Sequence, residues 1–283
     1  MRRLRTAIGR LTRGLCAVFA ISASITCDRG AQPAYLDLAT TTSVQNSGLL
    51  DTVLPAFTDE TGVKIRVHAA GSGRALEMLS DGIIDLAITH APAAEARYLS
   101  AHAGWSYQKV AYNRFVVVGP PGDPAMVRDA ADAVDAFRRI ARTPIRFVSR
   151  GDQSGTHERE LALWDAAGVT PESDRLVVSG RGMAMALRHA DEVVGYTLSD
   201  EATFWQLQPS LDLTILFDAD PRLLNSYAVV YPGGEERAGV LAKWLTEGAG
   251  RGLVGAYQAS GRAVFTVWPM TCPANTPDAL PCQ

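Results

Sequence analysis

The stretch FVSRGDQSGTHERELALW, residues 147–164, places an arginine, a carboxylate, two hydroxyls and a glycine between Arg150 and Thr156. The apolar residues before it are typical of a buried strand, and Ser154 stands where it would cap a following helix. A helix N-terminus presents unpaired backbone N–H groups and a partial positive charge. Arg150, Ser154, Gly155 and Thr156 therefore indicate a site for a small anion. A capped turn with a surface arginine is the simpler alternative, and this stretch alone does not decide between them.

Two other segments repeat the arrangement. The residues TTTS, at 40–43, follow a strand-like run, and so do the residues GSGR, at 71–74. In open α/β sheets such turns meet at the carboxyl ends of the strands, where ligands bind. The recurrence favours an anion site over simple capping. It adds four candidate contacts, which are Thr41, Thr42, Ser43 and Ser72.

A tetrahedral dianion suits these residue types. Hydroxyl and N–H donors can approach four oxygens without crowding, and Arg150 would add a permanent charge in a forked geometry. We expect Asp152 to orient Arg150 rather than to touch the anion, because a carboxylate would repel it. A salt bridge between these two residues at the surface is the alternative.

The segments that position these residues alternate between strand and helix, which predicts an α/β protein with mainly parallel sheets. The expected strands are residues 35–39, 63–69, 85–89, 115–118, 145–148, 175–178 and 193–197. The expected helices are residues 49–61, a helix opened by 71–73, and residues 130–141, 154–167, 182–189, 236–245 and 251–257. The GPPG run at 119–122 is expected to lead into a second lobe, and the chain to return near 223–231. Two lobes with two crossings form a hinged cleft.

Two further residues are candidates for an indirect role at this cleft. His90 follows the expected strand 85–89, and there it either faces the cleft or packs in the core. Arg222 lies at the return crossing, where a helix-capping or surface role is favoured over contact with the cleft.

The first 27 residues differ from the rest. Five arginines precede an apolar run at about 15–25, which predicts a secretory signal peptide and export to the periplasm or the outer face of the cell envelope. Cys27 closes a segment similar to a lipoprotein attachment box, so a lipid anchor there is an open alternative. Removal of residues 1–27 moves the formal net charge from −3 to −8, which argues against nucleic-acid binding.

Two cysteines lie near the C-terminus. In an oxidising compartment, Cys272 and Cys282 are expected to form a disulfide that ties down a proline-rich tail.

The phrases LATTTSVQNSGLLDTVLPAF, ITHAPAAE, FVSRGDQSGTHERELALW, GYTLSD and DPRLLNSYAVV resemble those of periplasmic tungstate-binding proteins of bacterial ABC transporters, over about residues 36–258. The resemblance implies the type II periplasmic binding protein fold, in which two α/β lobes joined by a two-crossing hinge close on an oxyanion. Lobe 1 would comprise residues 34–117 and 226–283, and lobe 2 residues 118–225. It also implies that the ligand is tungstate or molybdate and that the partner is a membrane permease. We expect a monomer without a cofactor, and another tetrahedral oxyanion, such as sulfate or phosphate, is the alternative ligand.

Position 90 distinguishes the chain from phosphate-binding relatives. Those proteins have an aspartate at the end of the third strand that accepts the proton of phosphate, whereas His90 stands there in DLAITHAP. Tungstate, molybdate and sulfate carry no proton at neutral pH, so the residues predict weak binding of phosphate.

Two alternatives belong to other classes. A secreted hydrolase would use Ser154 with His157, or Ser72 with His90, but neither serine lies in a G-x-S-x-G elbow. A sensor or adhesin domain on the same fold would make the oxyanion site optional.

Overall fold

The computed structural model describes residues 35–282, which lie in a unit spanning residues 33–283. The predicted signal peptide and Cys27 lie outside the described residues. No helix in the described part of the chain has the length and apolarity needed to cross a membrane.

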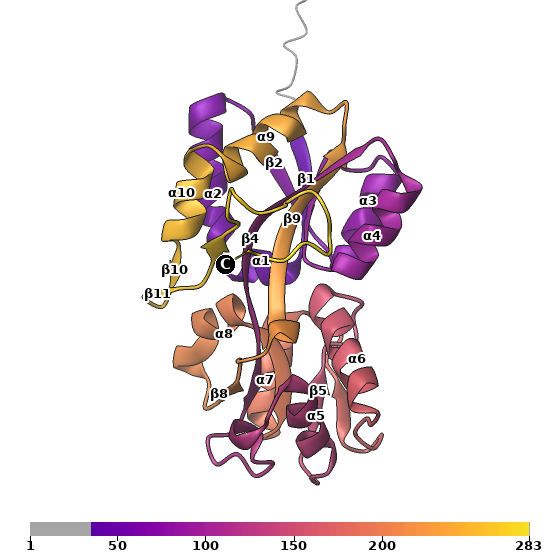
Figure 1. Cartoon of the computed structure of the whole chain (residues 1–283). Coiled ribbons are helices and arrows are strands. Elements are labelled where there is room, and N and C mark those ends of the chain that lie inside the picture. The colour runs from indigo at the N-terminus through magenta and orange to yellow at the C-terminus, as the bar shows by residue number, and fades with distance from the viewer. Residues whose placement is uncertain (1–34, 283) are drawn as a thin grey trace, which may run out of the picture. The chain divides into compact units, whose positions relative to one another are not determined.

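The elements alternate as the sequence predicts (Figure 1). The first are β1 (Leu36–Thr40), α1 (Thr42–Asn46), α2 (Leu49–Thr61), β2 (Ile65–Ala69), α3 (Ser72–Ser80), β3 (Leu86–Thr89), α4 (Pro92–Ala101), β4 (Trp105–Gly119), η1 (Val127–Asp129), α5 (Ala133–Ala141), β5 (Phe147–Ser149) and α6 (Gly155–Ala167). The others are β6 (Leu176–Val178), α7 (Met183–Glu192), β7 (Tyr196–Asp200), α8 (Glu201–Leu207), η2 (Gln208–Ser210), β8 (Thr214–Phe217), η3 (Pro221–Leu223), β9 (Leu224–Pro232), α9 (Glu236–Thr246), α10 (Ala249–Ala256), β10 (Gln258–Ala259), β11 (Arg262–Ala263) and β12 (Thr266–Val267).

The main sheet has two halves that share strand β4. Its central order is β2-β1-β3-β9-β4-β7-β5-β6. Strands β1, β2 and β3 are parallel, and so are β5, β6 and β7. Between these groups, β9 runs antiparallel to β3 and β4, and β7 runs antiparallel to β4. Residues 105–114 of β4 pair with β9 in the first half, and residues 115–119 pair with β7 and β8 in the second half. The α/β fold class is confirmed, while the exact bounds of the lobes stay a prediction.

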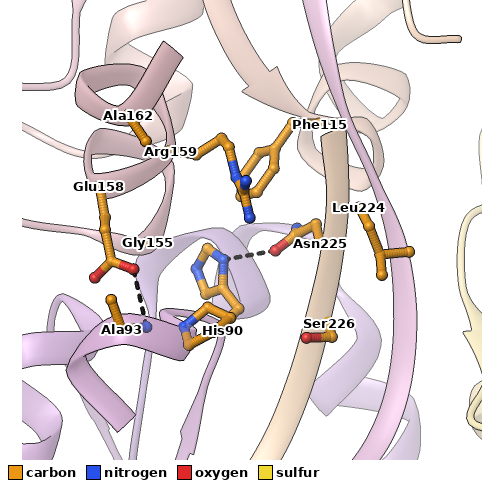
Figure 2. Close-up of a pocket in the computed structure, with 11 residues that line it drawn as sticks. His90, Ala93, Phe115, Gly155, Glu158, Arg159, Ala162, Leu224, Asn225 and Ser226 are labelled. Carbon is orange, nitrogen blue, oxygen red and sulfur yellow. Dashed lines mark hydrogen bonds between the residues drawn. The ribbon is translucent and has the colours of Figure 1, made fainter. Parts of the chain in front are cut away.

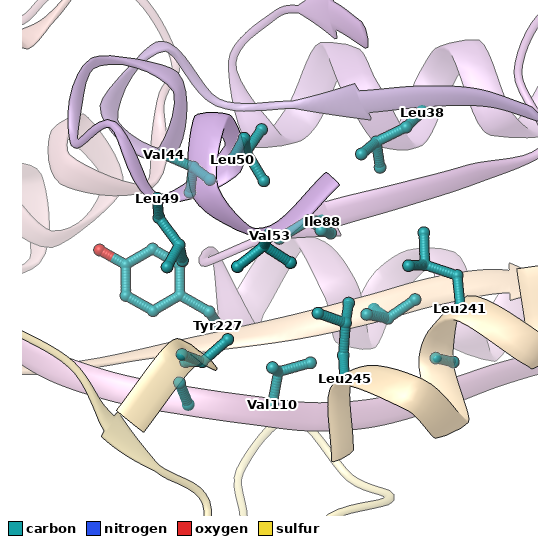
Figure 3. Packing of buried hydrophobic residues seen from close by; sticks show 14 of the residues in the cluster. Leu38, Val44, Leu49, Leu50, Val53, Ile88, Val110, Tyr227, Leu241 and Leu245 are labelled. Carbon is teal, nitrogen blue, oxygen red and sulfur yellow. The ribbon is translucent and has the colours of Figure 1, made fainter. Parts of the chain in front are cut away.

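Alternation along the strands supplies a core on each face of the sheet. In β1, Leu38 packs in the cluster with α2, α9 and α10, while Ala39 packs in the cluster with α3 and α4. Figure 3 shows the first cluster, where Leu38 lies with Val53 and Leu241. In β5, Phe147 and Val148 likewise enter two separate clusters of the second half. In each half, helices therefore pack on both faces of the sheet and fix the positions of the strand ends.

Several sequence predictions concern these elements directly. The helix predicted at Leu49–Thr61 is confirmed with the same bounds. Trp164 and Trp244 are buried. Within α6, Leu163 and Trp164 are buried, whereas Leu161 is 54% exposed. Helices α4 and α8 and the first ten residues of β4 were not predicted.

The C-terminal tail packs against β4. The structure joins Cys272 to Cys282 in a disulfide. Buried Lys109 donates from its backbone N–H to the carbonyl of Ala274, at 2.8 Å, and from Nζ to the carbonyl of Pro277, at 2.8 Å. The tail is therefore fixed at both its disulfide and the centre of the sheet.

Candidate functional site

The three predicted turns all lie where a strand ends and a helix begins. Thr41 caps α1, because its Oγ1 accepts a hydrogen bond from the N–H of Val44 at 3.2 Å. Ser154 caps α6 in the same way, since its Oγ accepts from the N–H of His157 at 3.3 Å. The cap predicted at Ser154 is confirmed. At the third turn, Gly71 precedes α3.

Close contacts bring these turns together. A Cβ placed on Gly71 would lie 3.4 Å from the carbonyl oxygen of Asp152, and one on Gly155 would clash with the carbonyl of His90. The turns before α3 and α6 therefore touch, and α6 begins against the end of β3. At position 155, only glycine allows the backbone of α6 to approach His90 this closely.

The turn before α1 meets two helices of the second half. A Cβ on Gly182, before α7, would lie 3.2 Å from Oγ1 of half-buried Thr42. The hydroxyl of Thr203, in α8, donates to the carbonyl of Ser43 at 3.4 Å. The N-terminal ends of α1, α3, α6, α7 and α8 thus gather in one region, which favours negative charge there.

Arg150 is buried in this region and only 1% exposed. Its Nη2 donates to Oδ2 of Asp152 at 2.6 Å, while Nε and Nη1 have no hydrogen-bond partner among residues 35–282. Burial opposes the charge of Asp152, but the charge of Arg150 and the bonds from Arg150 and Ser154 lower the pKa of Asp152. Asp152 thus holds one edge of Arg150, the contact that its predicted orienting role requires, and Arg150 keeps donors free on its other edge.

Several buried hydroxyls also retain a hydrogen to donate. Oγ of Ser43 and Oγ1 of Thr156 have no partner in the described part of the chain. The hydroxyl oxygens of Thr41, Ser72 and Ser154 each accept a backbone N–H. That role leaves the hydroxyl hydrogen free to point elsewhere. We call six residues the donor cluster: Thr41, Ser43, Ser72, Arg150, Ser154 and Thr156.

A fourth turn of the same kind was missed from the sequence. Ser179 and Gly180 follow β6 and precede α7, and their N–H groups donate to the carbonyls of Ser149 and Arg150, both at 2.9 Å. Oγ of Ser179 is buried and has no partner among the described residues. The letters VSGRG after a strand-like run carried the same signal as the other turns, so the pattern was available.

His90 lies beside the donor cluster. Its backbone N–H donates to Oγ of Ser72 at 3.2 Å, and its ring stacks on Tyr227 with centroids 5.2 Å apart. Nδ1 lies 2.9 Å from Oδ1 of Asn225, and Nε2 is buried without a partner among residues 35–282. Burial lowers the pKa of His90 to about 4, against the raising effect of Asp200. The ring is therefore uncharged at neutral pH.

Asp200 is a second functional candidate that sequence reasoning did not find. It is fully buried, caps α8 through Oδ1, and has no partner for Oδ2 within the described chain. Arg222, by contrast, is half-exposed and pairs with Asp220 and Asp132, at 2.9 and 3.4 Å. These contacts fix η3 to the start of α5 and give Arg222 a surface role.

A cavity of about 240 Å³ borders the donor cluster at His90 and Gly155 (Figure 2). It is further lined by Phe115 and Asn225 from β4 and β9 and by Arg159 from α6.

Neither serine–histidine pair has the geometry of a nucleophile and its base. Ser154 and Ser72 bond the backbone N–H groups of His157 and His90, not their rings. The ring of His157 accepts from the N–H of Gln153, and that of His90 meets Asn225.

Residues 30–248 match the family model described as PBP superfamily domain. The chain belongs to the PBP superfamily. This PBP superfamily member is 39% identical over 240 residues to the tungstate-binding protein TupA of Peptoclostridium acidaminophilum, covering 81% of the chain and 84% of that relative. The predicted type II fold is confirmed.

Two solved structures are also similar to this PBP superfamily member. One is the tungstate ABC transporter from Geobacter sulfurreducens, at a TM-score of 0.71 and 36% identity, covering 79% of this chain and 98% of that one. The other is the tungstate-binding protein TupA from Desulfovibrio alaskensis, at a TM-score of 0.70 and 34% identity, covering 82% and 98%.

Proposed function

We propose that the chain is an extracytoplasmic solute-binding protein that captures tungstate, or its near-isostere molybdate, and delivers it to an ABC transporter permease. It would act as a monomer, without a cofactor, after export by the signal peptide predicted at residues 1–27. The names of its relatives support this ligand and this class of partner.

One observation carries the choice of an oxyanion. Arg150, Ser43 and Thr156 hold four buried donor atoms without partners in the described chain. They lie in the turns and first helix residues that follow β1 and β5. A buried donor left unpaired costs about 1–3 kcal/mol. Several such donors together therefore cost a large fraction of the free energy of unfolding of a typical domain, which is about 5–15 kcal/mol. An anion with four oxygens would satisfy these donors together.

The donors also suit the charge of the anion. Arg150 supplies a permanent positive charge, and the nearby helix ends add partial positive charge. The carboxylate of Asp152 would repel an anion less than a free one, because it already accepts hydrogen bonds from Arg150 and from the N–H of Ser154. We infer that direct contacts come from Thr41, Thr42, Ser43, Ser72, Arg150, Ser154, Gly155 and Thr156.

We infer that the chain does not catalyse hydrolysis. The contacts of Ser154 and Ser72 with backbone N–H groups weigh against a catalytic pair, and the relatives named above are binding proteins.

The test is a calorimetric titration of purified, ligand-free protein with tungstate, molybdate, sulfate and phosphate. We expect one site per chain for tungstate and a much larger dissociation constant for phosphate. Absence of binding by both tungstate and molybdate would refute the proposed ligand, and tight binding of sulfate or phosphate instead would favour another oxyanion.

A further inference from the structure

The cavity beside His90 contains a cation that the proposed site does not use. Arg159 lies on α6, one turn after the cap Ser154, and its side chain is half-buried. In Figure 2 its guanidinium extends into the space bordered by Phe115, His90 and Asn225. Its Cζ lies 5.9 Å from the centroid of the Phe115 ring, and no hydrogen bond or ion pair of residues 35–282 involves this arginine.

The charges around the cavity leave Arg159 available to an anion. Glu158 is the lining carboxylate, and its Oε1 accepts from the N–H of Ala93 at 3.2 Å, at the start of α4. The charge of Asp220 also favours the charged form of Arg159, but Asp220 accepts from the N–H of Ala133 and pairs with Arg222. Burial lowers the pKa of Arg159 against these two acids, yet a guanidinium keeps its proton at neutral pH. His90 is uncharged there.

The cavity adjoins the donor cluster directly. Gly155 lines it and stands between Ser154 and Thr156 in the chain, and His90 lines it and donates to Ser72. A volume of about 240 Å³ holds a small oxyanion with several waters. Ser43, Arg150 and Thr156 are at most 1% exposed, whereas Ala93 and Ala162, which line the cavity, are exposed, so the cavity is open to solvent on a side where the donor cluster is not.

We propose that Arg159 provides this outer contact, holding an inorganic oxyanion in the cavity beside His90 before it enters the donor cluster. Arg159 is thus a second anion-contacting arginine, after Arg150, and it acts on entry. A fixed charge at the mouth of a site raises the local concentration of a counter-ion and its association rate. The proposal rests on the proposed function, because it concerns the same ligand.

Rapid-mixing kinetics test it, with tungstate as the probe and tryptophan fluorescence and rapid filtration of labelled tungstate as parallel readouts. For Arg159→Gln we expect the association rate constant to fall about fivefold and its salt dependence to weaken, while Kd changes by less than about threefold. Arg159→Lys keeps the charge and should stay near the wild-type rate. Arg222→Gln is the matched control, because this arginine is paired at the surface.

The outcomes separate the two claims. An association rate of Arg159→Gln equal to the wild-type rate would overturn the proposal. So would an Arg159→Lys variant as slow as Arg159→Gln, which would indicate a structural role, or a change confined to dissociation. Failure of the wild-type protein to bind tungstate at all would refute the proposed function, and this entry role with it.

Discussion

At the scale of single residues, burial decides which arginine can serve the site. Arg150 and Arg222 each pair with an aspartate close by in sequence, at 2.6 and 2.9 Å. The sequence could not separate them by partner alone. Arg150 is 1% exposed and keeps two nitrogens unpaired within the described chain, whereas the side chain of Arg222 is 51% exposed. A buried, partly unpaired guanidinium is costly unless a ligand completes it.

We predict that Arg150→Ala weakens tungstate binding by about 2–5 kcal/mol, because a charge-assisted bond to a desolvated anion is lost. This loss raises Kd by a factor of about 30 or more. Calorimetric titration measures the change. Arg222→Ala is the control, and a similar small effect of both substitutions would show that Arg150 does not contact the anion.

His90 bears on the choice between anions. The absence of a carboxylate at position 90 predicts weak binding of phosphate. The structure adds buried Asp200 nearby, whose Oδ2 has no partner among the described residues and whose charge raises the pKa of His90 against burial. The effects of His90 and Asp200 on the preference between tungstate and phosphate can therefore be compared by substitution.

We predict that phosphate binds at least about a hundredfold more weakly than tungstate at pH 7, a gap of roughly 2.7 kcal/mol. His90→Asp should narrow this gap, chiefly by weakening tungstate binding, because a new carboxylate repels a dianion. Competition between labelled tungstate and phosphate or molybdate measures it. Asp200→Asn keeps a capping side chain on α8 and is the matched control. If that substitution changes the gap and His90→Asp does not, Asp200 and not His90 sets the preference.

At the scale of elements, the sequence predicted the helices and caps that are set by interactions between neighbouring residues. The helix at Leu49–Thr61 and the capped start of α6 follow from apolar spacing and a capping serine, so both could be found in the sequence. The first part of β4 could not. It contains buried Lys109 and Asn113, whose partners are Pro277 and Asn225, far away in the sequence. Polar residues paired at long range hide the periodicity of a strand.

The C-terminal tail gives a prediction at this scale. It binds Lys109 through Pro277, inside the segment closed by the disulfide of Cys272 and Cys282. Replacing both cysteines by serine should lower the free energy of unfolding by about 2–3 kcal/mol, because the unfolded chain regains freedom. This corresponds to a fall in Tm of about 5–10 °C for a domain of this size.

Differential scanning calorimetry measures this fall. A reducing agent should lower the Tm of the wild-type protein and leave the double serine variant unchanged. An equal Tm for both proteins under oxidising conditions would contradict the stabilising role of the disulfide.

At the scale of the whole described unit, the site is assembled from segments that are far apart in sequence. Residues 40–43 and 71–74 belong to the first half of the sheet, and residues 149–156 and 179–182 belong to the second half. The sequence revealed most of these turns separately, because each has its own hydroxyls and glycines. It could not show that Thr42 lies against Gly182 or Gly71 against Asp152, since these contacts depend on how the strands are ordered. Both halves therefore contribute donors to the proposed ligand.

The location of the anion tests this account most directly. Crystals of the protein grown with tungstate would show the tungsten atom by its anomalous scattering. We predict a single strong peak surrounded by the side chains of Ser43, Arg150 and Thr156, with oxygens within hydrogen-bond distance of the nitrogens Nε and Nη1 of Arg150. A peak only in the cavity beside Arg159, or no peak in protein shown by calorimetry to bind tungstate, would contradict the assignment of the donor cluster as the binding site.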